Sequence, residues 1–178
     1  FFNAGGGCVN SAYSTVVAHE YGHFIVNRLG LAQNAFGEGF GDTVAMLSYN
    51  TPIVAADFFG PGSPIRNPPA ANVQYPCSNE IHFCGQVIAG CWWNIRNSGL
   101  GLAATQQLQV SWALITTGGP DSSNSAGPGT LVEVLVTDDN DGNIYNGTPH
   151  DNNICPSFAS HNILTPACGS GSASARRA

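Results

Sequence analysis

The segment H-E-Y-G-H at residues 19–23 constrains the fold of this chain more than any other. Two histidines four residues apart lie on one face of an α-helix, about one turn from each other. The flanking residues are mostly apolar and Gly30 is a typical helix end, so we expect a helix over residues 12–29. A buried helix with two histidines and a glutamate needs polar partners, and a metal ion is one such partner.

The pattern H-E-x-x-H is typical of zinc hydrolases. Both imidazoles can bind one Zn²⁺, and the glutamate beside the first of them can take a proton from a water molecule on that metal. The pattern therefore predicts His19 and His23 as zinc ligands and Glu20 as the general base. The simpler alternative is an amphipathic helix whose polar residues fall at this spacing by chance.

The third ligand decides the kind of zinc site. Metzincins add a glycine and a third histidine at fixed spacing, but Val26 and Leu29 occupy those positions here. Glu38 opens an expected helix over residues 38–49 and can supply a carboxylate instead. Asp42 lies one turn further on, where it can accept a hydrogen bond from the second ring nitrogen of a ligating histidine. The alternative for both acids is a solvated helix start, which the helix dipole favours.

Three glycines surround this carboxylate, at positions 37, 39 and 41. Glycine is a poor helix former. Its repetition in an expected helix indicates that the backbone approaches the H-E-x-x-H helix closely.

The motif H-E-Y-x-H followed by G-E-G-aromatic-x-D resembles the glutamate-zincins, specifically the fungalysin-like peptidases and their thermolysin-like relatives. The resemblance implies one catalytic Zn²⁺ held by His19, His23 and Glu38, with Glu20 as general base and Asp42 behind a ligating histidine. It also implies a mainly α fold of the α+β zincin type: the C-terminal half of a thermolysin-like peptidase, a helical bundle around the H-E-x-x-H helix with long loops. Relatives carry a β-rich half before this part, so we expect the full-length protein to contain one.

Residues 80–93 are similar to the segment of these enzymes in which a histidine opens an apolar helix. The resemblance implies that His82 stabilises the oxyanion of the tetrahedral intermediate, a role for a fixed hydrogen-bond donor. Thermolysin-like enzymes orient this histidine with an upstream acid, but the matching position is Cys77, and Glu80 is the candidate replacement. The alternative is a histidine at a helix start with no catalytic role.

Residues 138–150 resemble the D-x-D-G…N-G-T-P-H stretch of many secreted bacterial zinc peptidases. Alternating carboxylate and amide oxygens with a glycine at the turn suit Ca²⁺. Asp139, Asp141 and Asn143 are therefore candidate calcium ligands. A turn rich in Asp and Asn, without any metal, explains the same residues equally well.

Composition limits the partners and the location of the protein. The chain has 178 residues, no lysine, only 9% charged residues and a net charge of −6. We therefore expect no nucleic-acid interface, and no apolar run is long enough to predict a membrane span. A surface that is polar through uncharged residues suits an extracellular protein. The six cysteines contain no C-x-x-C pair, which favours disulfides over a cysteine zinc site.

Among the fifteen pairings that six cysteines allow, Cys155 with Cys168 is the local choice, because it would tie down the C-terminal segment. Cys84 and Cys91 are expected to pair with other segments rather than with each other. We expect one catalytic domain or subdomain over residues 1–168 and a flexible tail over residues 169–178.

The rest of the chain reads as helices joined by loops. Helices are expected over 81–98, 101–117 and 150–160, with loops over 52–76 and 118–129. Residues 130–137 are apolar and β-branched and fit a helix or a strand. The three tryptophans fall on expected helices and are assigned to the core.

Together these patterns predict a secreted zinc metalloendopeptidase that hydrolyses protein or peptide substrates by glutamate-assisted attack of zinc-bound water. A zinc aminopeptidase uses the same ligands and stays open as an alternative. A catalytically silent surface or structural protein that keeps the zincin fold is the alternative from another class.

Overall fold

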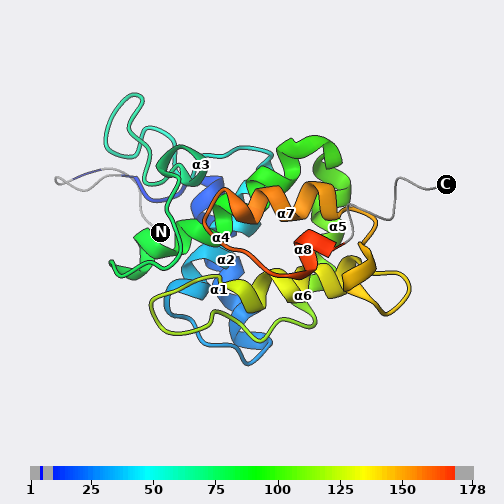
Figure 1. Ribbon diagram of the computed structural model, residues 1–178. Coiled ribbons are helices and arrows are strands. Elements are labelled where there is room, and N and C mark those ends of the chain that lie inside the picture. Colours follow the sequence, from blue (N-terminus) through cyan, green and yellow to red (C-terminus); the bar gives the residue numbers. More distant parts are fainter. Residues whose placement is uncertain (1–4, 6–9, 171–178) are drawn as a thin grey trace.

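The computed structural model describes residue 5 and residues 10–170, and these fold mainly as helices (Figure 1). The mainly α expectation is confirmed, and no multi-residue β-strand forms within residues 10–170. An isolated antiparallel bridge joins Val54 to Arg66 at the base of a protruding loop. The helical elements are α1 (Ser14–Arg28), α2 (Asn34–Tyr49), α3 (Pro68–Ala71), α4 (Ile81–Ile95), a π-helical turn (Arg96–Leu100), α5 (Leu102–Ala113), α6 (Pro128–Asp138), a 3-10 turn (Ile144–Asn146), α7 (Asp151–Ala159) and α8 (Ala167–Ser170).

Helix α1 carries the H-E-x-x-H segment and buries one stripe of its surface. The buried positions are Thr15, His19, Gly22 and Val26, which recur at helical spacing. Gly30 has a φ of 73° and ends the helix, as the sequence predicts. His19 therefore faces the interior because it belongs to the same stripe as the apolar positions.

Close packing brings α2 against α1 on one side and α4 on the other. A Cβ atom on Gly22 would lie 2.6 Å from Cα of Gly41, and one on Gly41 would lie 2.8 Å from Nδ1 of His19. A side chain on Gly39 would overlap the carbonyl oxygen of Gly85 in α4. The predicted close approach of the glycine-rich helix is confirmed, and the glycines allow the ligand-bearing backbones to come together.

Helix α2 begins at Asn34, four residues before the expected start at residue 38. Ala35 and Phe36 are fully buried, so tertiary packing extends the helix over residues whose sequence pattern is weak. As a result Glu38 lies in the second turn and is only 8% exposed, and Asp42 is 0% exposed. The alternative of a solvated helix start is wrong for both acids.

Helix α4 lies at the centre and packs against both α2 and α7. Its Trp92 packs against Trp112 of α5 in a tilted arrangement, with ring centroids 5.4 Å apart, and Phe40 of α2 adds a third ring 6.1 Å from Trp112. Trp93 is also buried. The assignment of all three tryptophans to the core is confirmed, and this core holds α2 rigidly behind the polar cluster.

The ambiguous segment 130–137 is helical and belongs to α6. Pro128 occupies the first turn, and the hydroxyl of Thr130 accepts the N–H of Gly127, both common features of a helix start. Helix α5 ends at Ala113 instead of residue 117, because the next residues turn to bind Glu133 of α6. The expected loop over residues 52–76 contains the one-turn helix α3.

Two disulfides join described cysteines. Cys155 pairs with Cys168, which confirms the local prediction, and Cys77 pairs with Cys84. Cys91 is a buried free thiol, whereas Cys8 lies outside the described residues.

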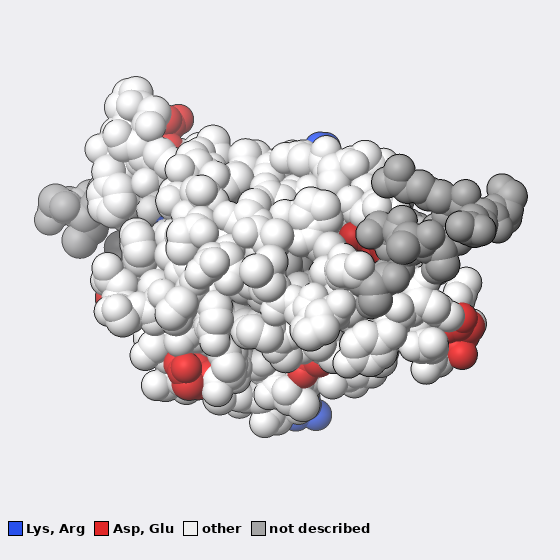
Figure 2. All heavy atoms as spheres, in the orientation of Figure 1, with Lys and Arg blue, Asp and Glu red and all other residues white. Residues whose placement is uncertain are grey.

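Of the predicted tail over residues 169–178, positions 169 and 170 end α8, and 171–178 lie outside the described residues. Charged side chains are sparse on the face that Figure 2 shows. Among the helices of the described part, none is both long and apolar enough to cross a bilayer.

Candidate metal centre

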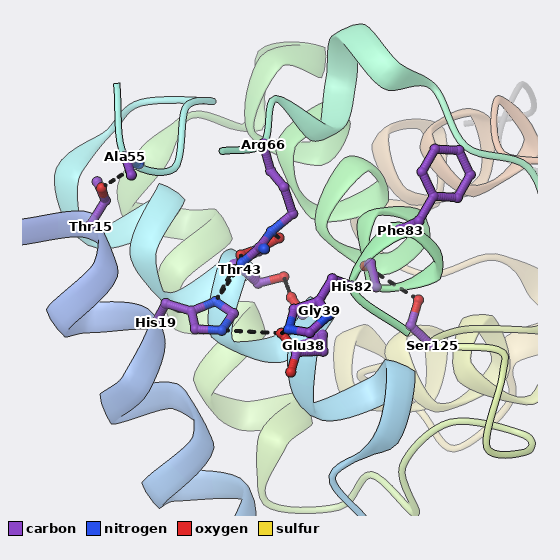
Figure 3. Close-up of polar contacts among 12 residues, drawn as sticks. Thr15, His19, Glu38, Gly39, Thr43, Ala55, Arg66, His82, Phe83 and Ser125 are labelled. Carbon is purple, nitrogen blue, oxygen red and sulfur yellow. Dashed lines mark hydrogen bonds and ion pairs between the residues drawn. The ribbon is translucent and has the colours of Figure 1, made fainter. Parts of the chain in front are cut away.

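Three predicted ligands from two helices meet at one point. The ligand atoms of His19, His23 and Glu38 all lie within 4.8 Å of one another. Nε2 of His19 is 3.3 Å from Oε2 of Glu38, and Nε2 of His23 is 3.5 Å from Oε1 (Figure 3 shows the His19 contact). Two ligands that are each about 2.1 Å from a tetrahedral zinc ion are about 3.4 Å apart. The spacing therefore fits a single metal ion.

The second ring nitrogen of each histidine is bound to an oxygen. Nδ1 of His19 lies 2.8 Å from Oδ1 of Asp42, and Nδ1 of His23 lies 2.8 Å from Oε1 of Gln33. Since these oxygens accept hydrogen bonds, each Nδ1 is the donor, and Nε2 is the ring position whose lone pair binds a metal once its proton is lost. Asp42 thus lies where the sequence predicted it. Gln33 was not predicted, because a polar residue before a helix carries no periodic signal.

Arg66 fixes Asp42 from the loop before α3 and is a residue that sequence reasoning missed. Its Nε donates to Oδ2 of Asp42 at 2.7 Å and its Nη2 donates to Oδ1 at 2.8 Å, a bidentate pair. The sequence offered one weak signal. In a chain with five arginines and no lysine, each arginine is a scarce positive charge.

The protonation states of the cluster are strongly coupled. Burial lowers the pKa of His19, but its contacts with the carboxylates of Asp42 and Glu38 outweigh burial and raise it to about 9. Burial raises the pKa of Glu38 and of Asp42, but the neighbouring His19 lowers both, with further help from Arg66 at Asp42. A metal ion that binds Nε2 of His19 replaces the proton that these carboxylates otherwise hold there.

One carboxylate oxygen in the cluster has no hydrogen bond. Oε2 of Glu38 is buried without a donor, because neither His19 nor His82, each with Nε2 3.3 Å away, has the geometry of a hydrogen bond to it. A buried carboxylate oxygen without a partner is costly. Together with two free imidazole nitrogens, it makes the donor set fit a metal ion.

Glu20 and His82 lie beside this cluster, around the same pocket. The pocket has a volume of about 140 Å³ and is lined by polar and apolar side chains: Val16, His19, Glu20, Val54, Ile65, Arg66 and His82. Glu20 is exposed to solvent, and the His82 side chain is half exposed. The structure therefore brings all five residues of the predicted zinc site and its chemistry to one place.

Glu80 contacts the ring of His82, as the sequence suggested. Its carboxylate lies against Nδ1 of His82 and also accepts the backbone N–H groups of His82 and Phe83 at 3.0 and 3.2 Å. The hydrogen bond from the His82 side chain is the main reason that the pKa of Glu80 is lowered. Glu80 is therefore both the N-cap of α4 and the partner that orients His82.

The candidate calcium ligands lie in a different part of the chain and bind backbone groups. Asp139 accepts the N–H of Gly142 at 2.6 Å, Asp141 accepts that of Asn143 at 3.0 Å, and Asn143 accepts that of Tyr145 at 3.2 Å. These are the bonds of a turn rich in Asp and Asn. Calcium binding stays a prediction.

Comparison with protein-family models, curated proteins and solved structures found no match for this chain. The evidence for a function is therefore the chemistry of the side chains themselves.

Proposed function

We propose that this protein is a secreted zinc-dependent metalloendopeptidase of the glutamate-zincin type, acting on protein or peptide substrates. The observation that carries the proposal is the convergence of His19, His23 and Glu38 within 4.8 Å, beside a pocket that also contains Glu20 and His82. A chance H-E-x-x-H pattern accounts for two histidines on one helix face. It does not account for a buried carboxylate from a second helix between them.

The donor set favours zinc. Two imidazoles and one carboxylate, with a fourth position left for water or substrate, are typical of catalytic zinc sites. When bound, zinc acts as a Lewis acid and lowers the pKa of a bound water to about 7. The carboxylate of Asp42 and the amide of Gln33 hold the rings of His19 and His23 so that both Nε2 atoms face Glu38.

Two further side chains supply the acid–base and electrostatic steps. The carboxylate of Glu20 accepts a proton from the attacking water and passes it to the nitrogen of the leaving amine. Nδ1–H of His82 faces the Glu80 carboxylate, so the doubly protonated ring is the form whose Nε2 donates a hydrogen bond to the carbonyl oxygen as negative charge develops on it. Both groups are accessible to a substrate, because Glu20 is exposed and the His82 side chain is half exposed.

The walls of the pocket suggest which substrate groups enter it. Val16, Val54 and Ile65 supply apolar surface beside the polar cluster. An apolar side chain of the substrate loses contact with water there, which favours its binding. We therefore expect cleavage next to apolar residues.

An extracellular location accords with two disulfides and with the absence of a membrane-crossing helix from the described part. Disulfides persist in oxidising compartments.

The test is cleavage of an internally quenched peptide with blocked ends by the full-length protein, with zinc and with a chelator. We expect zinc-dependent cleavage, and we expect Glu20→Gln to keep zinc while it loses at least about 100-fold in kcat. Asp151→Asn, a change of acid to amide in α7, is the matched control and should retain activity.

Three outcomes would count against the proposal in different ways. Full activity of Glu20→Gln would overturn the role of that residue. Cleavage restricted to peptides with a free amino terminus would indicate an aminopeptidase. Tight zinc binding without cleavage of any peptide would indicate a catalytically silent zincin-like protein.

A further inference from the structure

The disulfide Cys77–Cys84 encloses His82, which lines the pocket, and Glu80, which contacts the ring of His82. Its cysteines are seven positions apart, with Glu80 and His82 between them. Both cysteines are buried, whereas the side chains of Glu80 and His82 are 57% and 50% exposed. An exposed ion pair gains little from its own charges and loses side-chain entropy when it is held in one geometry. Something other than burial must therefore fix this pair.

Both ends of the enclosed segment are anchored to the loop before α6. The backbone N–H of Cys77 donates to Oδ1 of Asn124 at 2.7 Å, and the hydroxyl of Ser125 donates to the carbonyl of Cys84 at 2.7 Å (Figure 3 shows Ser125). Asn124 is in turn held by Asp121, which accepts its backbone N–H at 2.9 Å. The disulfide is thus attached to the body of the molecule at each cysteine.

Inside the segment, hydrogen bonds restrain the backbone between the two cysteines. The N–H of Asn79 approaches Sγ of Cys84 at 3.2 Å, and the N–H of Cys84 donates to the carbonyl of Glu80 at 3.0 Å. Glu80 then caps α4 and contacts the ring of His82 with the same carboxylate. Next, Gly85 packs on α2, where a Cβ atom would lie 2.9 Å from Cβ of Glu38.

We propose that the disulfide Cys77–Cys84 is a positioning element for His82, which fixes Glu80 against Nδ1 and so holds Nε2 beside Glu38. This inference rests on the proposed function, because it assigns His82 to the reaction. The cysteines of the second disulfide, Cys155–Cys168, are thirteen positions apart, and no residue of the candidate site lies between them. It is therefore a natural control for the effect of losing a disulfide.

The experiment compares the variant Cys77→Ala/Cys84→Ala with the variant Cys155→Ala/Cys168→Ala, each at a temperature where it is folded. In the first we expect kcat to fall by about 10–100-fold, with zinc affinity and KM changed by less than about 3-fold. In the second we expect kcat to be unchanged. Equal losses of kcat in both variants, or full kcat in the first, would overturn the proposal.

A third variant covers the case in which the first does not fold. Glu80→Ser retains the disulfide and a good N-cap residue but cannot contact the His82 ring. We expect it to lose kcat by a similar factor without loss of zinc. Full kcat in this variant would show that Glu80 serves only as a helix cap.

A measurement without catalysis separates this proposal from the proposed function. Amide hydrogen exchange at His82 and Phe83 should become at least about 10-fold faster in Cys77→Ala/Cys84→Ala and stay unchanged in the control, since exchange reports local opening. If the parent protein cleaves no peptide, the proposed function fails while the exchange result still decides whether the disulfide orders this segment. Unchanged exchange would show that it does not.

Discussion

Two buried carboxylates each hold a histidine ring, and the difference between them shows what makes a metal centre. Asp42 lies 2.8 Å from Nδ1 of His19, and Asp138 lies 2.6 Å from Nδ1 of His150. The side chains of Asp42 and Asp138 are 0% and 4% exposed. By the geometry of the pair alone, either histidine is oriented as a metal ligand.

The two pairs differ in what surrounds the free ring nitrogen. Nε2 of His19 faces Glu38, whose Oε2 has no hydrogen-bond donor. His150 instead lines a pocket of about 240 Å³. Among the residues that line this pocket, the one carboxylate is that of Asp138, which already contacts Nδ1 of His150. Asp138 also accepts the hydroxyl of Thr148 and the N–H of His150, so its charge is already satisfied. An oriented histidine is a common structural unit, and a metal centre requires convergent ligands with unsatisfied charge.

The largest expected effect comes from removing that convergent ligand. Glu38→Gln should weaken zinc binding by more than about 100-fold, because the loss of a direct ligand exceeds the 10–100-fold typical of residues behind a ligand. Asp138→Asn should leave zinc affinity unchanged. Competition with a chromophoric chelator measures the zinc affinity of both variants. Equal affinities would show that Glu38 matters no more for zinc binding than Asp138.

The next effect comes from the residue behind His19. Asp42→Asn should weaken zinc binding by about 10–100-fold, because a neutral amide accepts the hydrogen bond from Nδ1 of His19 less strongly than a carboxylate does. It also leaves the buried guanidinium of Arg66 without its bidentate partner, which is costly. Asp42→Asn/Arg66→Gln should therefore unfold at a higher temperature than Asp42→Asn while its zinc affinity stays low. A double variant that regains zinc affinity would contradict the orienting role of Asp42.

The charge coupling also predicts how stability depends on pH in the metal-free protein. The pKa of His19 is raised from 6.5 to about 9, so its stabilising contribution is complete below pH 6.5 and is lost as pH rises through 9. The pKa values of Glu38 and Asp42 are lowered, so their contribution is present above about pH 5 and is lost in acid.

The unfolding temperature in chelator should therefore be highest between about pH 5 and 6.5 and should fall by pH 9.5. The loss corresponds to at most about 3 kcal/mol. His19→Gln should lack the decrease at high pH. A decrease of the same size in that variant would assign the effect to another group.

The smallest effect concerns calcium at the acidic turn beside His150. Asp139 and Asp141 already accept backbone N–H groups, so we expect no site with a Kd below about 1 mM. A site of that affinity adds less than about 0.4 kcal/mol at 1 mM Ca²⁺, or roughly 1 °C in unfolding temperature. A larger rise that Asp141→Asn abolishes would establish the calcium site.

Much of the fold followed from local patterns. The helix around residues 19–23, its end at Gly30 and the buried tryptophans were predictable, because apolar periodicity and glycine act over a few residues. The predicted helix ends were wrong where tertiary contacts outweighed local preference. Burial of Phe36 lengthened α2, and the bonds to Glu133 shortened α5. Such contacts join residues far apart in sequence, which no local pattern records.

For the site, the residue types and one spacing could be predicted from the sequence. Helical geometry dictates that His19 and His23 share a face, and the G-E-G pattern after H-E-x-x-H predicted Glu38 as the third ligand. Local proximity also made Cys155–Cys168 predictable. These features depend only on bonded neighbours or on distances within a helix.

Which oxygens are left without a hydrogen bond depends on how the chain folds. The tertiary structure brought Arg66 to Asp42 and Gln33 to His23, and it placed Glu80 and His82 inside a second disulfide. In the acidic turn it gave Oδ2 of Asp139 and Oδ1 of Asp141 a backbone N–H each and left Oδ1 of Asp139 buried without a hydrogen bond. The physical reason is that a hydrogen bond or a metal site needs a partner within about 3 Å in a fixed direction. Chain folding sets that distance for residues that the sequence leaves far apart.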